Sequence, residues 1–246
     1  TATATQAVLA FQHGGMYRFD LDANTKRFAV GQAVDDSSEA LCVAIAPPTS
    51  AGAFADVIGV GLPGAFVTMP ARGDGALSRV VKRLTCPADP TSAAFVTMAD
   101  NQLYAFVGLA NGALVRLTID PATGVMLAVD ETSLGTGACT VVPPSAAQRA
   151  PHVLVTCDGV LFKASLIEGG HHVAPVHPHP DAGIRGVEAV CDVTSGKFPL
   201  GHAALVHGGN VITFARVGAG VSHVRRLAAP PGQGLTARKI VLHPAE

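Results

Sequence analysis

Short apolar runs separated by turn residues recur along the chain, and the clearest pair lies near its middle. Leu103–Leu109 and Ala113–Ile119 are rich in β-branched and aromatic residues, and Asn111 and Gly112 stand between them. Both turn residues tolerate a positive φ, which tight hairpin turns require. Pro121 fixes φ and turns the chain again after the second run. The pattern predicts a β-hairpin followed by a second turn.

This hairpin pattern repeats at a nearly constant interval. Turn glycines in matching positions are Gly15, Gly64, Gly112, Gly159 and Gly209, and their successive spacings are 49, 48, 47 and 50 residues. Spacings this regular indicate a structural repeat. We assign the five glycines a structural role at hairpin tips, since glycine adopts a positive φ without strain.

Each repeat supplies up to four predicted strands. The strands before the turn glycines are expected at Ala7–Phe11, Ala55–Gly61, Leu103–Leu109, His152–Thr156 and His202–His207, and those after them at Met16–Leu21, Ala65–Met69, Ala113–Ile119, Val160–Leu166 and Val211–Val217. Opening strands are expected at Ala40–Ala46, Ala93–Met98, Ala138–Val142 and Val187–Val193, and closing strands at Phe28–Val34, Leu77–Leu84, Met126–Ser133 and Val221–Leu227. Four short strands in about fifty residues are typical of a propeller blade. We therefore predict an all-β, WD40-like β-propeller with about five four-stranded blades, and almost no helix because no segment has helical apolar periodicity.

Composition agrees with one large β domain. The 246 residues are 48% hydrophobic and only 14% charged, which provides ample material for a core. The net charge of −1 and the absence of a Lys/Arg block argue against a nucleic-acid-binding surface; Arg225-Arg226 is interpreted as a solvated strand end. No apolar run approaches the roughly 20 residues of a membrane helix. The start at Thr1 has neither Met nor the features of a signal peptide, so we expect a longer protein around this sequence.

Five cysteines, an odd number, show no C-x-x-C spacing: Cys42, Cys86, Cys139, Cys157 and Cys191. Cys42, Cys139 and Cys191 fall at equivalent places in three opening strands, where a small buried hydrophobic residue fits. We interpret the cysteines as free core thiols of a reducing compartment. None lies at a glycine-rich elbow or a helix start, which disfavours a catalytic nucleophile.

Gly59–Gly64 matches the dinucleotide-binding pattern G-x-G-x-x-G and follows a predicted strand. A dinucleotide site would need a helix after the last glycine, because the helix N-terminus holds the pyrophosphate. The following residues, Ala65–Pro70, predict a second strand instead. The match is therefore interpreted as a hairpin, and no cofactor is predicted.

Histidines and carboxylates are the remaining candidates for metal binding or catalysis. His171, His172, His177 and His179 form the densest group of candidate metal ligands, but Pro175, Pro178 and Pro180 favour an extended geometry that splays the side chains, so no metal site is predicted. His13, His207 and His223 are interpreted as solvent-facing turn residues. Asp20, Asp22, Asp120 and Asp158 lie in predicted turns, where Asp has a conformational role. A glycosidase would need paired carboxylates across a channel, and a serine hydrolase a G-x-S-x-G elbow, which is absent; hydrolase activity stays a minor alternative.

Several motifs carry a resemblance to a known family. They are the run Val107–Arg116, then Asp120–Gly124, Ser133–Gly135 and the closing run Thr236–Glu246, with Gly14–Asp22 and Val57–Leu62 in register. In these motifs the chain resembles the central propeller of the large multi-propeller family that contains splicing factor 3b subunit 3, the damage-specific DNA-binding protein large subunit and the cleavage and polyadenylation specificity factor large subunit. The Leu-x-Asn-Gly and Asp-Pro-x-Thr-Gly motifs and the terminal run place it nearest the splicing branch.

The resemblance implies an architecture and a set of partners. Residues 1–235 would supply about five blades of a seven-bladed central propeller, and residues 236–246 the junction and first strand of the next one. It implies a non-enzymatic nuclear scaffold, without catalytic residues, that supports the U2 particle in branch-site recognition and holds a HEAT-repeat splicing subunit. It implies no direct nucleic-acid or membrane contact from this segment. The DNA-damage and ubiquitin-ligase branch and the mRNA 3′-end-processing branch remain alternatives.

Overall fold

The fold is taken from a computed structural model of residues 1–246. It describes residues 6–10, 16–20, 25, 32–35, 39–47, 57–70, 82–143, 152–167, 170–176, 186–193, 202–209, 211–216 and 220–226. The chain forms two compact units, Thr1–Val141 and Val142–Glu246. The predicted boundary after residue 235 lies outside the described residues.

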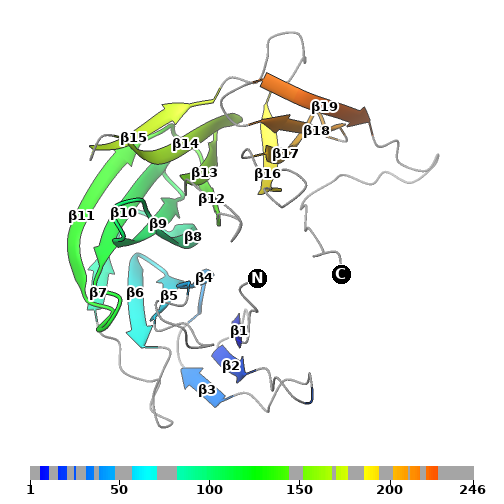
Figure 1. The fold of residues 1–246 in the computed structure, drawn as a ribbon. Helices are drawn as coiled ribbons and strands as arrows, with labels where there is room; N and C mark the ends of the chain where they lie inside the picture. Colours follow the sequence, from blue (N-terminus) through cyan, green and yellow to red (C-terminus); the bar gives the residue numbers. More distant parts are fainter. Residues whose placement is uncertain are drawn as a thin grey trace. The chain divides into compact units, whose positions relative to one another are not determined.

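The first unit contains three antiparallel sheets (Figure 1). A three-stranded sheet is formed by β1 (Gln6–Ala10), β2 (Met16–Asp20) and β3 (Gln32–Asp35). The next sheet contains β4 (Cys42–Ile45), β5 (Val57–Leu62), β6 (Ala65–Pro70) and β7 (Lys82–Thr85). The third contains β8 (Pro90–Thr97), β9 (Leu103–Leu109), β10 (Ala113–Ile119) and β11 (Met126–Ser133). In each sheet the strands follow one another in chain order.

The second unit repeats this arrangement. One sheet contains β12 (Thr140–Val142), in which the boundary between the units falls, with β13 (His152–Cys157), β14 (Val160–Ile167) and β15 (Gly170–Pro175). The other contains β16 (Val187–Asp192), β17 (His202–His207), β18 (Val211–Arg216) and β19 (Gly220–Arg226). The described part of the chain is therefore all-β, with four antiparallel four-stranded sheets and no helix. In these residues no helix has the length and apolar character needed to cross a membrane.

Turn chemistry explains the tight central hairpins. Between β13 and β14, Cys157 pairs with Val160, so Asp158 and Gly159 alone make the turn. Both have a positive φ, of 49° and 76°, as the favoured two-residue turn requires. An Asp-Gly pair meets this requirement at little steric cost, because Asp tolerates the left-handed region better than most residues.

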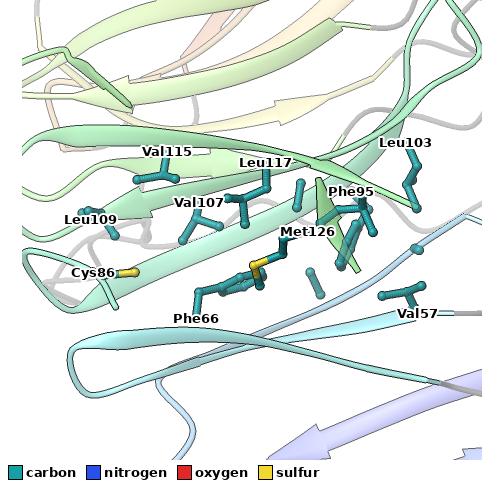
Figure 2. Close-up of a cluster of buried hydrophobic side chains, with 14 of the residues drawn as sticks. Val57, Phe66, Cys86, Phe95, Leu103, Val107, Leu109, Val115, Leu117 and Met126 are labelled. Carbon is teal, nitrogen blue, oxygen red and sulfur yellow. The ribbon is translucent and has the colours of Figure 1, made fainter. Parts of the chain in front are cut away.

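A buried apolar cluster joins the β4–β7 and β8–β11 sheets (Figure 2). Phe66 of β6 is fully buried, and it lies among Phe95, Val107 and Leu117 from the neighbouring sheet. Alternate residues of β9 and β10 face this cluster, which follows from the two-residue period of a strand. These two sheets thus bury their facing apolar sides against each other.

The predicted strands occur in the described residues, with one addition. β15 was not predicted, because its sequence, Gly-His-His-Val-Ala-Pro, has a single large aliphatic residue. It forms by pairing along β14, with Val173 opposite Ala164 and His172 opposite Ser165. Cross-strand pairing therefore builds a strand that the local apolar pattern does not indicate.

Candidate interaction surface

The predicted turn glycines lie at hairpin tips wherever they are described. Gly64, Gly112, Gly159 and Gly209 follow the second strand of their sheets and have φ values of 63°, 83°, 76° and 78°. Gly15 lies outside the described residues. Positive φ at all four positions gives a physical reason for glycine at each of them.

The chain returns to two of these tips by the same hydrogen bond. The amide of Cys86, just after β7, donates to the Gly64 carbonyl at 2.9 Å, and the amide of Leu134, just after β11, donates to the Gly112 carbonyl at 2.9 Å. Each donor follows its glycine by 22 residues (86 − 64 and 134 − 112). The closing strand of both sheets therefore ends beside the hairpin tip.

Two hairpin tips are capped by carboxylates of residues that lie far away in the sequence. Asp89 Oδ1 accepts the Gly64 amide at 2.8 Å, and Glu188 Oε1 accepts the Gly209 amide at 2.7 Å. The sequence analysis did not identify these caps, because the partners are 25 and 21 residues apart. Both carboxylates thus stabilise turns.

Asp120 also has the conformational role expected of it. Its carboxylate accepts the Ala122 amide at 2.9 Å and the Thr123 hydroxyl at 2.6 Å. The bond from Thr123, with that from Ala122, lowers the pKa of Asp120 below its usual value. Asp158 lies in the tight turn before β14, as predicted, and Asp22 lies outside the described residues. Asp20 was predicted to lie in a turn, but it is the last residue of β2 and pairs with Gln6.

The G-x-G-x-x-G match is a hairpin, as the sequence predicted. β5 and β6 are antiparallel, and Leu62 pairs with Ala65 across the turn. A Cβ on Gly59 would lie 2.5 Å from Cζ of Phe66, and one on Gly61 would lie 2.6 Å from Sγ of Cys42 and 2.8 Å from Cβ of Pro90. The glycines are explained by close packing between strands and neighbouring sheets.

The histidines near β15 do not form a metal site in the described residues. His171 and His172 are adjacent on β15, so their side chains leave opposite faces of the strand, and no group of three or more metal-ligating residues occurs in the described regions. His177, His179 and His13 lie outside the described residues. His223 was predicted to lie in a turn, but it lies within β19 and pairs with Phe214.

The prediction of a solvent-facing His207 was wrong. His207 is 6% exposed, and its Nε2 lies 2.9 Å from Thr213 Oγ1. Burial lowers the pKa of His207 below 6.5, while the Glu188 carboxylate opposes the shift. The last residue of β17 is thus enclosed by the same sheet whose hairpin tip Glu188 caps.

All five cysteines are free thiols, and Cys86, Cys139 and Cys157 are buried. Burial raises the pKa of Cys42 to about 11 and also raises that of Cys86. Thiols with raised pKa values have little thiolate character and are poor nucleophiles. Cys42 and Cys86 are therefore suited to packing.

Exposed apolar and acidic side chains lie together on β11, the closing strand of its sheet. Met126 is buried, whereas every residue from Leu127 to Ser133 is exposed. Leu127 is 62% and Val129 49% exposed, and Asp130 and Glu131 follow directly. The sequence analysis predicted this strand but not its exposure, because its apolar residues resemble those of a buried strand.

A row of polar and aromatic side chains runs from β11 across the neighbouring strands β10 and β9. The Arg116 guanidinium pairs with the Asp130 carboxylate across β10 and β11 and lies 5.8 Å from the centre of the Tyr104 ring on β9. The Tyr104 hydroxyl donates to Asp100 at 2.6 Å, and burial, with this bond, raises its pKa to about 12. Tyr104 therefore stays protonated at physiological pH, and the row positions Asp130 on the strand.

Comparison with known proteins identifies the fold but not a family. No family model and no curated protein matches the chain. A crystal structure of BBS1N in complex with ARL6DN, soaked with lead, matches with a TM-score of 0.57 and 14% identity over 89% of this chain and 63% of that one. A crystal of the same complex soaked with mercury matches with a TM-score of 0.57 and 14% identity over 91% and 64% of the two chains.

The chain thus spans less than two thirds of the length of these structures. At 14% identity the likeness concerns the fold alone. BBS1 is a propeller, so the comparison and the antiparallel four-stranded sheets are together consistent with a β-propeller.

Proposed function

We propose that this chain is a non-enzymatic protein-interaction scaffold built on a β-propeller. The observation that carries the proposal is the repeated four-stranded sheet, together with the likeness to BBS1N, which was crystallised in complex with ARL6DN. Among the described carboxylates, Asp89, Asp120 and Glu188 accept hydrogen bonds from backbone amides in turns, so each has a structural role. The exposed strand β11 offers apolar and charged side chains to a protein partner.

The finer architecture that we propose is a seven-bladed ring to which this chain contributes about five blades. The near-constant spacing of the turn glycines supports it, since the blades of a propeller are copies of one repeated sheet.

We further propose membership of the multi-propeller family, in its splicing branch, with a nuclear location and a HEAT-repeat partner. This proposal rests on the sequence resemblance at Val107–Arg116, Asp120–Gly124 and Thr236–Glu246. The last of these lies outside the described residues. The ubiquitin-ligase and 3′-end-processing branches are the alternatives.

The test is affinity purification of the complete protein from cells, followed by quantitative mass spectrometry. A scaffold should recover partner proteins in stoichiometric amounts, and the splicing branch predicts components of the U2 particle among them. Recovery of ubiquitin-ligase or 3′-end-processing subunits would replace the splicing branch by one of its alternatives. Recovery of a protein without any stoichiometric partner would overturn the scaffold proposal itself.

A further inference from the structure

The closing strands of the sheets differ in how well their free edges are protected. A strand at the edge of a sheet presents unpaired backbone groups, and proteins protect such edges with short strands, charged side chains (lysine above all), proline or β-bulges. The closing strands are β3 with four residues, β7 with four including Lys82 and Arg83, β11 with eight, β15 with six including Pro175, and β19 with seven including Arg225 and Arg226. β11 alone among them is longer than four residues and has neither a basic residue nor proline. Its charged residues are the acidic Asp130 and Glu131, and its one irregularity is a bulge at Leu127, near its start.

The edge of β11 is available in the described structure. β11 stands at the end of its sheet and pairs there with β10 alone. Leu127 and Val129 provide exposed apolar surface, and all seven residues after Met126 are exposed. An added strand gains main-chain hydrogen bonds from such an edge and side-chain contacts from alternate positions.

The acidic residues of β11 indicate which kind of partner strand would pair with it. Asp130 and Glu131 are adjacent and exposed, and Asp130 is already paired with Arg116 in a geometry that fixes its carboxylate. An antiparallel pair of two β11 strands centred between Asp130 and Glu131 would place Asp130 of each copy opposite Glu131 of the other, which is unfavourable. A segment with lysine or arginine among apolar residues would instead complement both the charge and the apolar surface.

We propose that β11 is a docking strand that accepts an extended basic and apolar segment of a partner protein as a fifth strand of the β8–β11 sheet. The proposal rests on the scaffold function and names the edge through which that function operates. The row formed by Tyr104, Arg116 and Asp130 holds the acidic side of the docking strand in place.

The test compares three forms of the complete protein in affinity purification: wild type, the double variant Leu127→Lys/Val129→Lys, and Thr85→Lys. The double variant gives β11 the protection that Lys82 and Arg83 give β7, and Thr85 is an exposed residue on β7 that controls for an added charge on a closing strand. At least one stoichiometric partner should fall about tenfold or more with the double variant and remain with Thr85→Lys. Unchanged far-ultraviolet circular dichroism would show that the variants fold.

A photo-crosslinking residue at position 127 of the complete protein then identifies the segment. A link to a lysine- or arginine-containing apolar segment of the lost partner supports the docking strand, and Glu131→Lys should weaken that partner's binding further at low salt than at high salt. Retention of every partner by the double variant, or a link to a second copy of the chain or to an acidic segment, would overturn the inference while leaving the scaffold intact. A wild-type protein without partners would instead remove the scaffold proposal, and the docking strand with it.

Discussion

The hydroxyl of Thr68 donates a hydrogen bond of 2.7 Å to the carbonyl of Gly124, 56 residues further along the chain. Thr68 lies on β6 and is fully buried, and Gly124 belongs to the turn between β10 and β11. The bond thus joins two neighbouring sheets at the turn that begins with Asp120. This hydrogen bond is a polar contact between two sheets that otherwise meet through apolar side chains.

Removing this hydroxyl should destabilise the first unit. In Thr68→Val a buried carbonyl loses its donor, and we expect the free energy of unfolding to fall by about 1–3 kcal/mol. Thr68→Ser keeps the hydroxyl and is the matched control, with a loss of about 1 kcal/mol for the missing methyl. Urea unfolding measures both, and a Thr68→Val variant as stable as the wild type would show that the bond contributes nothing.

Two turn glycines that are equivalent in the sequence should respond differently to Ala. A Cβ at Gly64 meets nothing within 4 Å, so Gly64→Ala should cost only the positive-φ strain of about 1–2 kcal/mol. A Cβ at Gly112 would overlap the carbonyl oxygen of Gly135, so Gly112→Ala should cost about 3 kcal/mol or more. Thermal unfolding of the two variants checks this order, and equal shifts in Tm would contradict the close approach of Gly135.

The stability of the second unit should fall in mild acid because of His207. Burial lowers the pKa of His207 in the folded protein below 6.5, so the unfolded chain takes up the proton first as the pH falls. The contribution is complete above pH 6.5 and is lost as the pH drops from there through the lowered folded pKa. His207→Gln should therefore be less stable at about pH 8 but lose less stability on acidification to about pH 5. Parallel stability curves for the two proteins would rule out a titrating, buried His207.

Cys42 should resist alkylation while the protein is folded. A pKa of about 11 leaves little thiolate at about pH 8. We expect iodoacetamide to modify Cys42 at least about 100-fold more slowly in the native protein than in urea, where its pKa returns to the ordinary range. Peptide mass spectrometry after timed quenching measures the two rates, and rapid native modification would refute the packing role.

Much of the fold could be predicted from the sequence because its signals are local. Asn111-Gly112 and Asp158-Gly159 predict hairpin turns, and the apolar runs around them have the length of strands. The caps by Asp89 and Glu188 could not be predicted in this way, since each carboxylate meets an amide more than twenty residues away.

Burial also depends on tertiary contacts that a local pattern does not contain. His207 ends a strand, which usually means exposure, but Thr213 of the neighbouring strand encloses it. Val129 is of a residue type usually found in the core, yet it is exposed because β11 is the last strand of its sheet. The exposed docking strand was therefore visible only in the structure.

An experimental structure of the complete protein, by electron cryomicroscopy or crystallography, tests the repeat architecture most directly. We predict that the five sheets follow one another in chain order around one axis, and that Gly15, like Gly64 and Gly112, lies at a hairpin tip. Sheets that neighbour one another out of chain order, or a Gly15 buried within a strand, would contradict the account.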